Sequence, residues 1–176
     1  MPELIEALSL WIPRANCKLD SFVADYPHPV LINFTEQTEG PPVIAFKTTG
    51  DDQLKKEIKC KQAEKELGVK LSKLTPESQV FYLYCKGQRT DYTIGRAANN
   101  DIVILQPPVS KLHAIIVCLE DGTRKIKDVS TNGTLLNEST LAAERTLQDK
   151  DVIRIAYTTL VYYIPATLHR ILGIVS

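Results

Sequence analysis

The sequence of 176 residues lacks several features that mark common classes of protein. Lys plus Arg and Asp plus Glu are equal at 21 each, so no charge excess points to nucleic acid or to an anionic membrane. No apolar stretch reaches the ~18 residues that a membrane-spanning helix needs. The acidic start, Met-Pro-Glu-Leu-Ile-Glu, is unlike a signal peptide. We therefore expect a cytoplasmic protein whose partners include neither nucleic acid nor a membrane.

Cysteine is scarce and lacks the spacing of a metal site. Cys17, Cys60, Cys85 and Cys118 include no Cys-x-x-Cys pair, and the histidines do not cluster near them. Zinc sites usually show such spacing, so no metal is predicted, and no motif indicates a cofactor. Cys85 and Cys118 fall in apolar runs, where a reduced thiol in the core is the expected state.

The first 77 residues are expected to form a small α+β region whose role the sequence does not reveal. Residues 3–12 carry an apolar stripe that predicts a short helix ending at Pro13. Asn16 is expected to cap a second short helix, which must end before Pro27.

Two apolar runs, 30–34 and 43–46, predict a β-hairpin with a long loop. Residues 51–67 are predicted to form a helix that ends at Gly68, and 70–79 a linker. Seven lysines between residues 55 and 73 invite a nucleic-acid hypothesis, but five carboxylates in 51–66 interrupt them. We therefore favour a solvated helix face.

The second domain, 78–176, has a different texture, with short strands at close spacing. Strands this short and frequent favour a β-sandwich over a parallel sheet with crossover helices. Asp121-Gly122 and Asn132-Gly133 are hairpin signals, because glycine adopts positive φ readily. An apolar stripe after Thr167 predicts a short C-terminal helix lying on the sandwich. The predicted strands are 80–85, 91–94, 102–105, 112–119, 124–128, 134–136, 152–155 and 159–164.

Several different polar blocks lie at or near the ends of these strands. They are Tyr92-Thr-Ile-Gly-Arg96, Asn100-Asp101-Ile-Val, Ser110-x-x-His113-Ala114, Asp121-Gly122-Thr123, Asp128-x-Ser130-Thr131-Asn132-Gly133-Thr134 and Leu136-Asn137. Together, in this order, they resemble a forkhead-associated (FHA) domain over about residues 78–165. The resemblance implies a mainly β fold, a sandwich of about eleven short strands. It also implies binding of phosphothreonine-containing protein segments, such as a Ser/Thr kinase or its substrate, through loops at one end.

The residue types in these blocks fit that role. Arg96 can donate two parallel hydrogen bonds to a phosphate, which a lysine cannot. Ser110 and Thr131 offer neutral donors, and Lys111 adds a second positive charge. The amide of Asn132 both donates and accepts, so it is expected to hold the peptide backbone beside the phosphothreonine.

Four further residues are expected to support the loops without touching the ligand. Gly95 and Gly133 allow tight bends of the main chain, His113 is implied by the family to order the loop through hydrogen bonds, and Asp128 stabilises a turn. Asn137 is interpreted in the same way, as the turn residue of a hairpin. A competing interpretation of Arg96 is a surface ion pair with Asp101.

The sequence departs from the family pattern at two places. Lys111 stands where many relatives carry Arg or Asn, which leaves its share of phosphate binding open. Gln148-Asp149-Lys150-Asp151 replaces a turn that often contains glycine, and we expect this to change a surface turn and little else. Pro107-Pro108 is expected to stiffen the approach to Ser110 and so preorganise the loop.

Three functions compete at this point. The leading hypothesis is a non-enzymatic reader of phosphothreonine in Ser/Thr-kinase signalling, with no catalytic residues. The second is a phosphate-independent assembly module that uses the sandwich and the N-terminal region. The third is an enzyme with Ser110, His113 and Asp128 as nucleophile, base and orienting acid, but no Gly-x-Ser-x-Gly motif surrounds Ser110.

Overall fold

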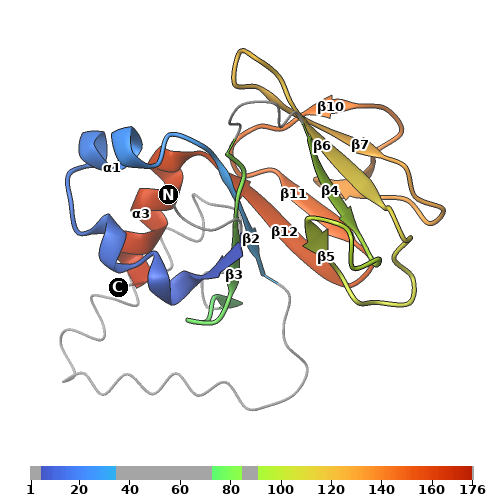
Figure 1. The fold of residues 1–176 in the computed structure, drawn as a ribbon, viewed down its shortest axis with the longest axis horizontal. Helices are drawn as coiled ribbons and strands as arrows, with labels where there is room; N and C mark the ends of the chain where they lie inside the picture. Colours follow the sequence, from blue (N-terminus) through green and yellow to red (C-terminus); the bar gives the residue numbers. More distant parts are fainter. Residues whose placement is uncertain (1–4, 35–72, 85–90, 176) are drawn as a thin grey trace.

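A computed structural model describes residues 5–34, 73–84 and 91–175 of the chain. Two sheets and a layer of helices make up these residues, and Figure 1 shows the helices on one side, one sheet in the middle and the second sheet beyond it. The prediction of a mainly β sandwich with a short C-terminal helix is confirmed.

The middle sheet has seven strands in the order β1-β3-β2-β12-β11-β8-β9. All of its described pairings are antiparallel. Its strands are β1 Ile5–Ala7, β2 Val30–Asn33, β3 Gln79–Tyr82, β8 Leu135–Leu136, β9 Ser139–Thr140, β11 Val152–Ile155 and β12 Thr158–Tyr163.

The outer sheet has five strands in the order β10-β7-β6-β4-β5. Its pairings are antiparallel except for β4 with β5, which run parallel. Its strands are β4 Asp91–Gly95, β5 Ile102–Val103, β6 Ala114–Cys118, β7 Arg124–Asp128 and β10 Arg145–Thr146.

The central strands β2 and β12 of the middle sheet are buried on both faces, which explains their nearly continuous apolar sequences. Because side chains alternate along a strand, Val161 and Tyr163 of β12 pack toward the helices, while Leu160 and Tyr162 pack between the sheets. The run Val30–Asn33 does the same from β2. The fold therefore has two cores that share one sheet.

The helical layer consists of η1 Leu8–Leu10, η2 Pro13–Ala15, α1 Leu19–Asp25 and α3 Pro165–Val175. Its centre is Trp11, which is fully buried and contacts the rings of Tyr26 and Tyr82 at centroid distances of 5.3 and 5.6 Å. Phe22 of α1 contacts the ring of His169 of α3 at 5.1 Å, which joins the two helices. No helix in the described ranges is long and apolar enough to cross a membrane.

Three local predictions in this layer and its turns are wrong. Within 3–12, residues 5–7 are strand β1 and 8–10 a 3-10 helix, because pairing of β1 with β3 outweighs local propensity. The helix after Asn16 exists, but its N-cap residue is Lys18 and no side chain caps it. The turn 148–151 does more than close a surface loop, because the Asp149 carboxylate accepts bonds from Ile164 N and Thr167 Oγ1 at the start of α3.

The two hairpin signals have different outcomes. Gly122, with φ of 86°, lies in the turn that joins the paired strands β6 and β7. Gly133 also has positive φ, at 87°, but its loop leads from β7 in one sheet to β8 in the other, so the hairpin prediction there is wrong. Asn137, with φ of 50°, lies in the tight turn between β8 and β9.

The remaining predictions concern the strands and the N-terminal region. Strands 124–128 and 152–155 match β7 and β11 residue for residue, whereas β1, β9 and β10 were not predicted. The run 43–46 and the helix at 51–67 lie outside the described residues. The division after residue 77 stays a prediction, and β2 from the first part pairs with both β3 and β12 from the second.

Candidate functional site

Three loops meet at one end of the sandwich, and we call them the site loops. They are 96–101 between β4 and β5, 104–113 between β5 and β6, and 129–134 between β7 and β8 (Figure 1). Backbone hydrogen bonds join them. Arg96 N donates to Ser110 O at 2.9 Å, and Val129 N donates to His113 O at 2.9 Å. The loops therefore form one connected surface.

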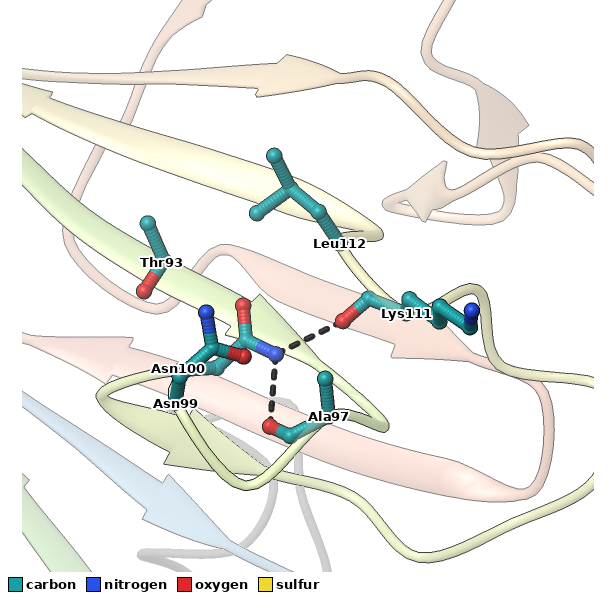
Figure 2. Close-up of a pocket in the computed structure, with 6 residues that line it drawn as sticks. All are labelled: Thr93, Ala97, Asn99, Asn100, Lys111 and Leu112. Atoms are coloured by element: carbon teal, nitrogen blue, oxygen red, sulfur yellow. Dashed lines mark hydrogen bonds between the residues drawn. The ribbon is translucent and has the colours of Figure 1, made fainter.

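Gly95 and Asn100 lock the first site loop to the second. The Asn100 side-chain amide donates to Ala97 O at 2.7 Å and to Lys111 O at 2.6 Å, as Figure 2 shows. A Cβ added at Gly95 would collide with the Lys111 carbonyl oxygen and lie 2.9 Å from Asn100 Nδ2. Only glycine therefore permits this close approach of the two backbones.

His113 lies beneath the site loops and is only 1% exposed. Ser110 N donates to His113 Nδ1 at 3.1 Å, and His113 Nε2 lies 3.2 Å from Gly133 O. Nδ1 must therefore accept, and the proton is assigned to Nε2, which donates to Gly133 O. Burial lowers the pKa of His113 below the usual 6.5, despite the opposing effect of the Gly133 carbonyl. The neutral ring thus joins the second and third loops.

Arg96 is exposed, and its guanidinium is oriented by the second loop. Its Nε donates to Val109 O at 3.1 Å, which fixes the side chain beside Ser110. Its two terminal nitrogens have no hydrogen-bond partner in the part of the chain that the structure describes. The carboxylate of Asp101, the competing partner, accepts from Thr93 N at 2.8 Å and from Thr93 Oγ1 at 2.9 Å.

Ser110, Thr131 and Asn132 lie on the second and third loops. Thr131 N donates to Ser110 Oγ at 3.1 Å, which brings the two hydroxyl-bearing residues together. The Asn132 amide donates to Pro108 O at 2.7 Å, so Pro108 fixes its orientation. Thr131 and Asn132 are exposed and Ser110 is half-buried, which leaves all three within reach of a ligand.

Asp128 and Gly133 shape the third loop. One Asp128 carboxylate oxygen accepts from Ser130 N at 3.1 Å and from Thr134 Oγ1 at 3.0 Å. Gly133 N donates to Ser130 Oγ at 2.8 Å. The Asp128 carboxylate is thus engaged within its own loop, and the cations of the site, Arg96 and Lys111, remain exposed.

Lys111 borders a hollow of about 300 Å³ beside the first loop. Figure 2 shows the ammonium group of Lys111 directed away from Asn100. The lining is Thr93, Ala97, Asn99, Asn100, Lys111 and Leu112. The carbonyl oxygen of Lys111 accepts from Asn100, and the positively charged ammonium of this exposed residue can attract an anion.

The arrangement of Ser110, His113 and Asp128 differs from a catalytic triad. A triad needs the imidazole to accept from the serine hydroxyl and to donate to the carboxylate. Here His113 Nδ1 accepts from the backbone N of Ser110, and Nε2 faces a carbonyl oxygen. In the described ranges no cluster of three or more His, Cys, Asp or Glu could hold a metal ion.

Three contributors to the site loops were not assigned a role from the sequence. They are Asn100, which joins two loops, Ser130, which closes the third loop, and the carbonyl of Pro108. Asn100 and Ser130 belong to the polar blocks described above, and their membership of these blocks was the available signal. The Pro108 carbonyl has no signal in the sequence, because every residue has such a group.

A comparison with protein families finds one match, which covers this surface. Residues 92–156 match the FHA domain family. A search of curated proteins gives no match. The matched residues include every residue of the three site loops.

Solved structures of FHA proteins are similar to part of the chain. EmbR of Mycobacterium tuberculosis, in complex with a low-affinity phosphopeptide, is 34% identical over 44% of this chain and 21% of its own, with a TM-score of 0.41. The chain thus spans about a fifth of EmbR. The N-terminal FHA domain of S. cerevisiae Rad53p, in complex with a phosphothreonine peptide, is 24% identical over 52% of this chain and 88% of its own (TM-score 0.46). The FHA domain of Chlamydia trachomatis CT664 is 24% identical over 49% and 85% (TM-score 0.45).

Proposed function

We propose that this protein, whose residues 92–156 match the FHA domain family, is a phosphothreonine-dependent binding module in Ser/Thr-kinase signalling. One observation carries the proposal. The side chain of Arg96 is fixed by Val109 O beside the joined residues Ser110 and Thr131, while its two terminal nitrogens remain available. A phosphate with about −1.5 to −2 charges and three acceptor oxygens is the ligand that such a group of donors binds best.

The proposed ligands of the phosphate are Arg96, Ser110, Lys111 and Thr131. Arg96 binds two phosphate oxygens at once, and Lys111 contributes a second charge from the rim. Asn132 holds the peptide backbone next to the phosphothreonine, since its carbonyl oxygen is still able to accept while its amide donates to Pro108 O.

Gly95, His113, Asp128 and Gly133 support this site and do not touch the ligand. Each joins or shapes the site loops through the contacts described above. A site held in this way before the ligand arrives loses little conformational entropy on binding. The partner is a phosphothreonine-containing protein such as a kinase or a kinase substrate, and we propose that it is met in the cytoplasm.

An FHA domain is a binding module, and we propose that the whole chain has no catalytic activity. The bonds of Ser110 and His113 support this, because neither prepares a nucleophile. Hydrolysis of an ester or phosphate substrate that disappears in Ser110→Ala would contradict it.

The proposal is tested with an oriented library of phosphothreonine peptides and the same library after dephosphorylation. We expect binding of phosphorylated peptides only, with individual sequences giving Kd values that can be followed by calorimetry. Equal binding of both libraries, or a protein partner retained by Arg96→Ala, would instead favour the phosphate-independent assembly module.

A further inference from the structure

One face of the outer sheet is covered by no described helix or strand. In Figure 1 the middle sheet and the helices all lie on its other side. Side chains alternate along a strand, and Ala114, Ile116 and Cys118 of β6 point into the sandwich interior. Ile115 and Val117 of β6 therefore point outward, and both are partly exposed. We call this side of the outer sheet the outer face.

An apolar stripe runs along β6, the central strand of the outer face. Exposed Leu119 continues the outward alternation just beyond β6. At the other end, exposed Leu112 lies with Thr93 at the hollow shown in Figure 2. A sheet face that meets water usually carries polar side chains, so this row of aliphatic residues indicates contact with another protein. The stripe consists of Leu112, Ile115, Val117 and Leu119.

The two strands beside β6 carry charges of opposite sign. Val117 pairs with Asp91 of β4 on one side and with Lys125 of β7 on the other. The neighbouring residues Tyr92 and Ile126 are buried between the sheets, so Asp91 and Lys125 point outward. This row across the outer face thus reads acid, aliphatic residue, lysine.

The next outward row repeats this order. Ile115 pairs with Thr93 of β4 and with exposed Lys127 of β7. The Asp101 carboxylate is held at Thr93, whose backbone N and Oγ1 both donate to it. In both rows, negative charge therefore lies on the β4 side of the stripe and positive charge on the β7 side.

A face with this order of charges is complementary to a second copy of itself. A two-fold axis along β6 places the β4 side of each copy against the β7 side of the other. Asp91 of one copy then faces Lys125 of the other, and the apolar stripes meet at the axis. A two-fold axis across the strands would instead place lysine against lysine, which like-charge repulsion opposes. The charges thus favour one orientation.

We propose that the outer face joins two copies of this chain in a symmetric dimer whose two-fold axis runs along β6. Five strands at ~4.8 Å and five residues at ~3.4 Å give this face a flat area of about 400 Å². Stable complexes bury ~800 Å² per partner, so the dimer is weak and depends on protein concentration. Lys125 also pairs with Glu144 of its own chain at 3.2 Å, but an exposed pair of this kind contributes little.

The dimer places two phosphate sites at one end. Rotation about an axis along β6 keeps the direction of the strand, and the three site loops lie where β6 begins. The sites of both copies therefore face the same way. This consequence rests on the proposed function: a partner with two phosphothreonines can bind both copies at once, and so more tightly than a partner with one.

Sedimentation velocity of the full chain at increasing protein concentration tests the dimer. We expect the wild type to change from monomer to dimer. Ile115→Lys places a charge at the axis, against the same charge of the other copy, and should leave only monomer where the wild type is half dimeric. Leu10→Lys is the matched control, because Leu10 is exposed in the helical layer and the variant should dimerise like the wild type.

An exchange of charges tests the direction of the axis. Asp91→Lys and Lys125→Asp should each raise the Kd of the dimer by about three- to tenfold, because ion pairs become like-charge pairs. The double variant Asp91→Lys/Lys125→Asp should regain the wild-type Kd. Within one chain β6 separates the two residues, so this recovery reports a contact between copies. Circular dichroism spectra of all variants confirm that the fold is intact.

Phosphopeptides test the consequence for the phosphate sites. A phosphothreonine peptide selected from the library is prepared as one copy and as two copies joined by flexible linkers of increasing length. The two-copy peptide should bind the dimeric wild type at least about tenfold more tightly than the single copy, and Ile115→Lys only about twofold more tightly. Equal ratios for the two proteins would show that the sites do not share one end.

Each other outcome overturns a definite statement. A wild type that stays monomeric, or a dimer that survives Ile115→Lys, overturns the dimer and leaves the proposed function standing. Single variants that weaken the dimer without recovery in the double variant overturn the axis along β6. A dimer that binds no phosphothreonine peptide overturns the proposed function alone. A monomeric wild type whose Ile115→Lys variant binds phosphopeptide normally but loses a protein partner assigns the outer face to that partner instead of a second copy.

Discussion

The site loops and the helical layer lie on different parts of the sandwich and are stabilised by different forces. The site loops are held by hydrogen bonds between backbone groups and the side chains of Asn100, Ser130 and Asn132, and most of their ligand-facing side chains are exposed. The helical layer is held by buried apolar contacts around Trp11 and Phe22. The loops therefore depend on precisely placed polar groups. The helical layer contains most of the apolar surface that is buried outside the space between the two sheets.

This contrast predicts that substitutions in the two regions change different properties. Substitutions in the helical layer should lower the free energy of unfolding and leave binding by the folded protein unchanged. Substitutions in the site loops should weaken binding more than they lower the free energy of unfolding. The predictions below test the contrast in order of decreasing effect.

The largest effect is expected for Trp11→Ala. Trp11 is fully buried between two tyrosine rings, and removal of such a side chain costs about 3–5 kcal/mol of unfolding free energy. Chemical denaturation measures this cost. Phosphopeptide affinity per folded molecule should be unchanged, and a tenfold loss would mean that the layer also shapes the site.

Arg96→Ala should weaken phosphopeptide binding at least tenfold and nearer to a hundredfold. One hydrogen bond to a charged group contributes about 1.5–3 kcal/mol, and ~1.4 kcal/mol corresponds to tenfold in Kd. Arg154→Ala is the matched control, because exposed Arg154 of β11 pairs with Glu138 outside the site loops. Calorimetry measures the Kd of both variants. Equal losses of affinity would show that the net charge of the protein, and not the position of Arg96, determines binding.

Asn100→Ala should have a smaller effect, and it should change both the free energy of unfolding and the phosphopeptide affinity. It removes the hydrogen bonds to Ala97 O and Lys111 O, at a cost of about 1–2 kcal/mol in unfolding free energy. Because the first loop is then less firmly joined to the second, affinity should also fall by about threefold. The neighbouring, exposed Asn99→Ala serves as the control and should change neither quantity measurably.

The smallest effect concerns pH and His113. Because burial lowers the pKa of His113 in the folded protein below 6.5, the folded state resists protonation more than the unfolded state does. Stability from this residue is fully present above pH 6.5 and is lost as the pH falls from there toward the lowered pKa of the folded state.

Melting temperatures without peptide, between pH 8 and pH 5, measure the effect of His113. Omitting the peptide matters because phosphate itself titrates with a pKa of about 6. Burial also lowers the pKa of His28, so the comparison is between wild type and His113→Gln. The wild type should lose more stability on acidification, and identical profiles would exclude His113 as the source.

The same contrast explains what the sequence could predict. The site loops are encoded locally, by residues such as Gly95, Asn132 and Gly133 whose side chains or backbone freedom are needed at those positions. The strands β7 and β11 are also local, since buried residues alternate with less buried ones along them and turns bound them. The bounds of β7 and β11 were predicted correctly, and the roles of the site residues stay predictions.

The helical layer depends on contacts that are distant in sequence. Ile5–Ala7 is a strand because β3, more than seventy residues later, offers a free edge, and no local pattern contains this information. Leu8 and Trp11 fit a helical stripe equally well, which produced the wrong prediction. The hydrogen bond from Tyr157 N to the side chain of Gln106 could likewise not be predicted from a local pattern, because the two residues are 51 positions apart in the sequence.

An NMR titration of the ¹⁵N-labelled protein with a phosphothreonine peptide tests the central claim most directly. The account predicts that the largest shifts fall on the Nε of Arg96 and on the backbone amides of Ser110, Lys111 and Thr131, with the side-chain amide of Asn132. The dephosphorylated peptide should leave these signals in place. Shifts confined to the helical layer, or equal shifts with both peptides, would contradict the account.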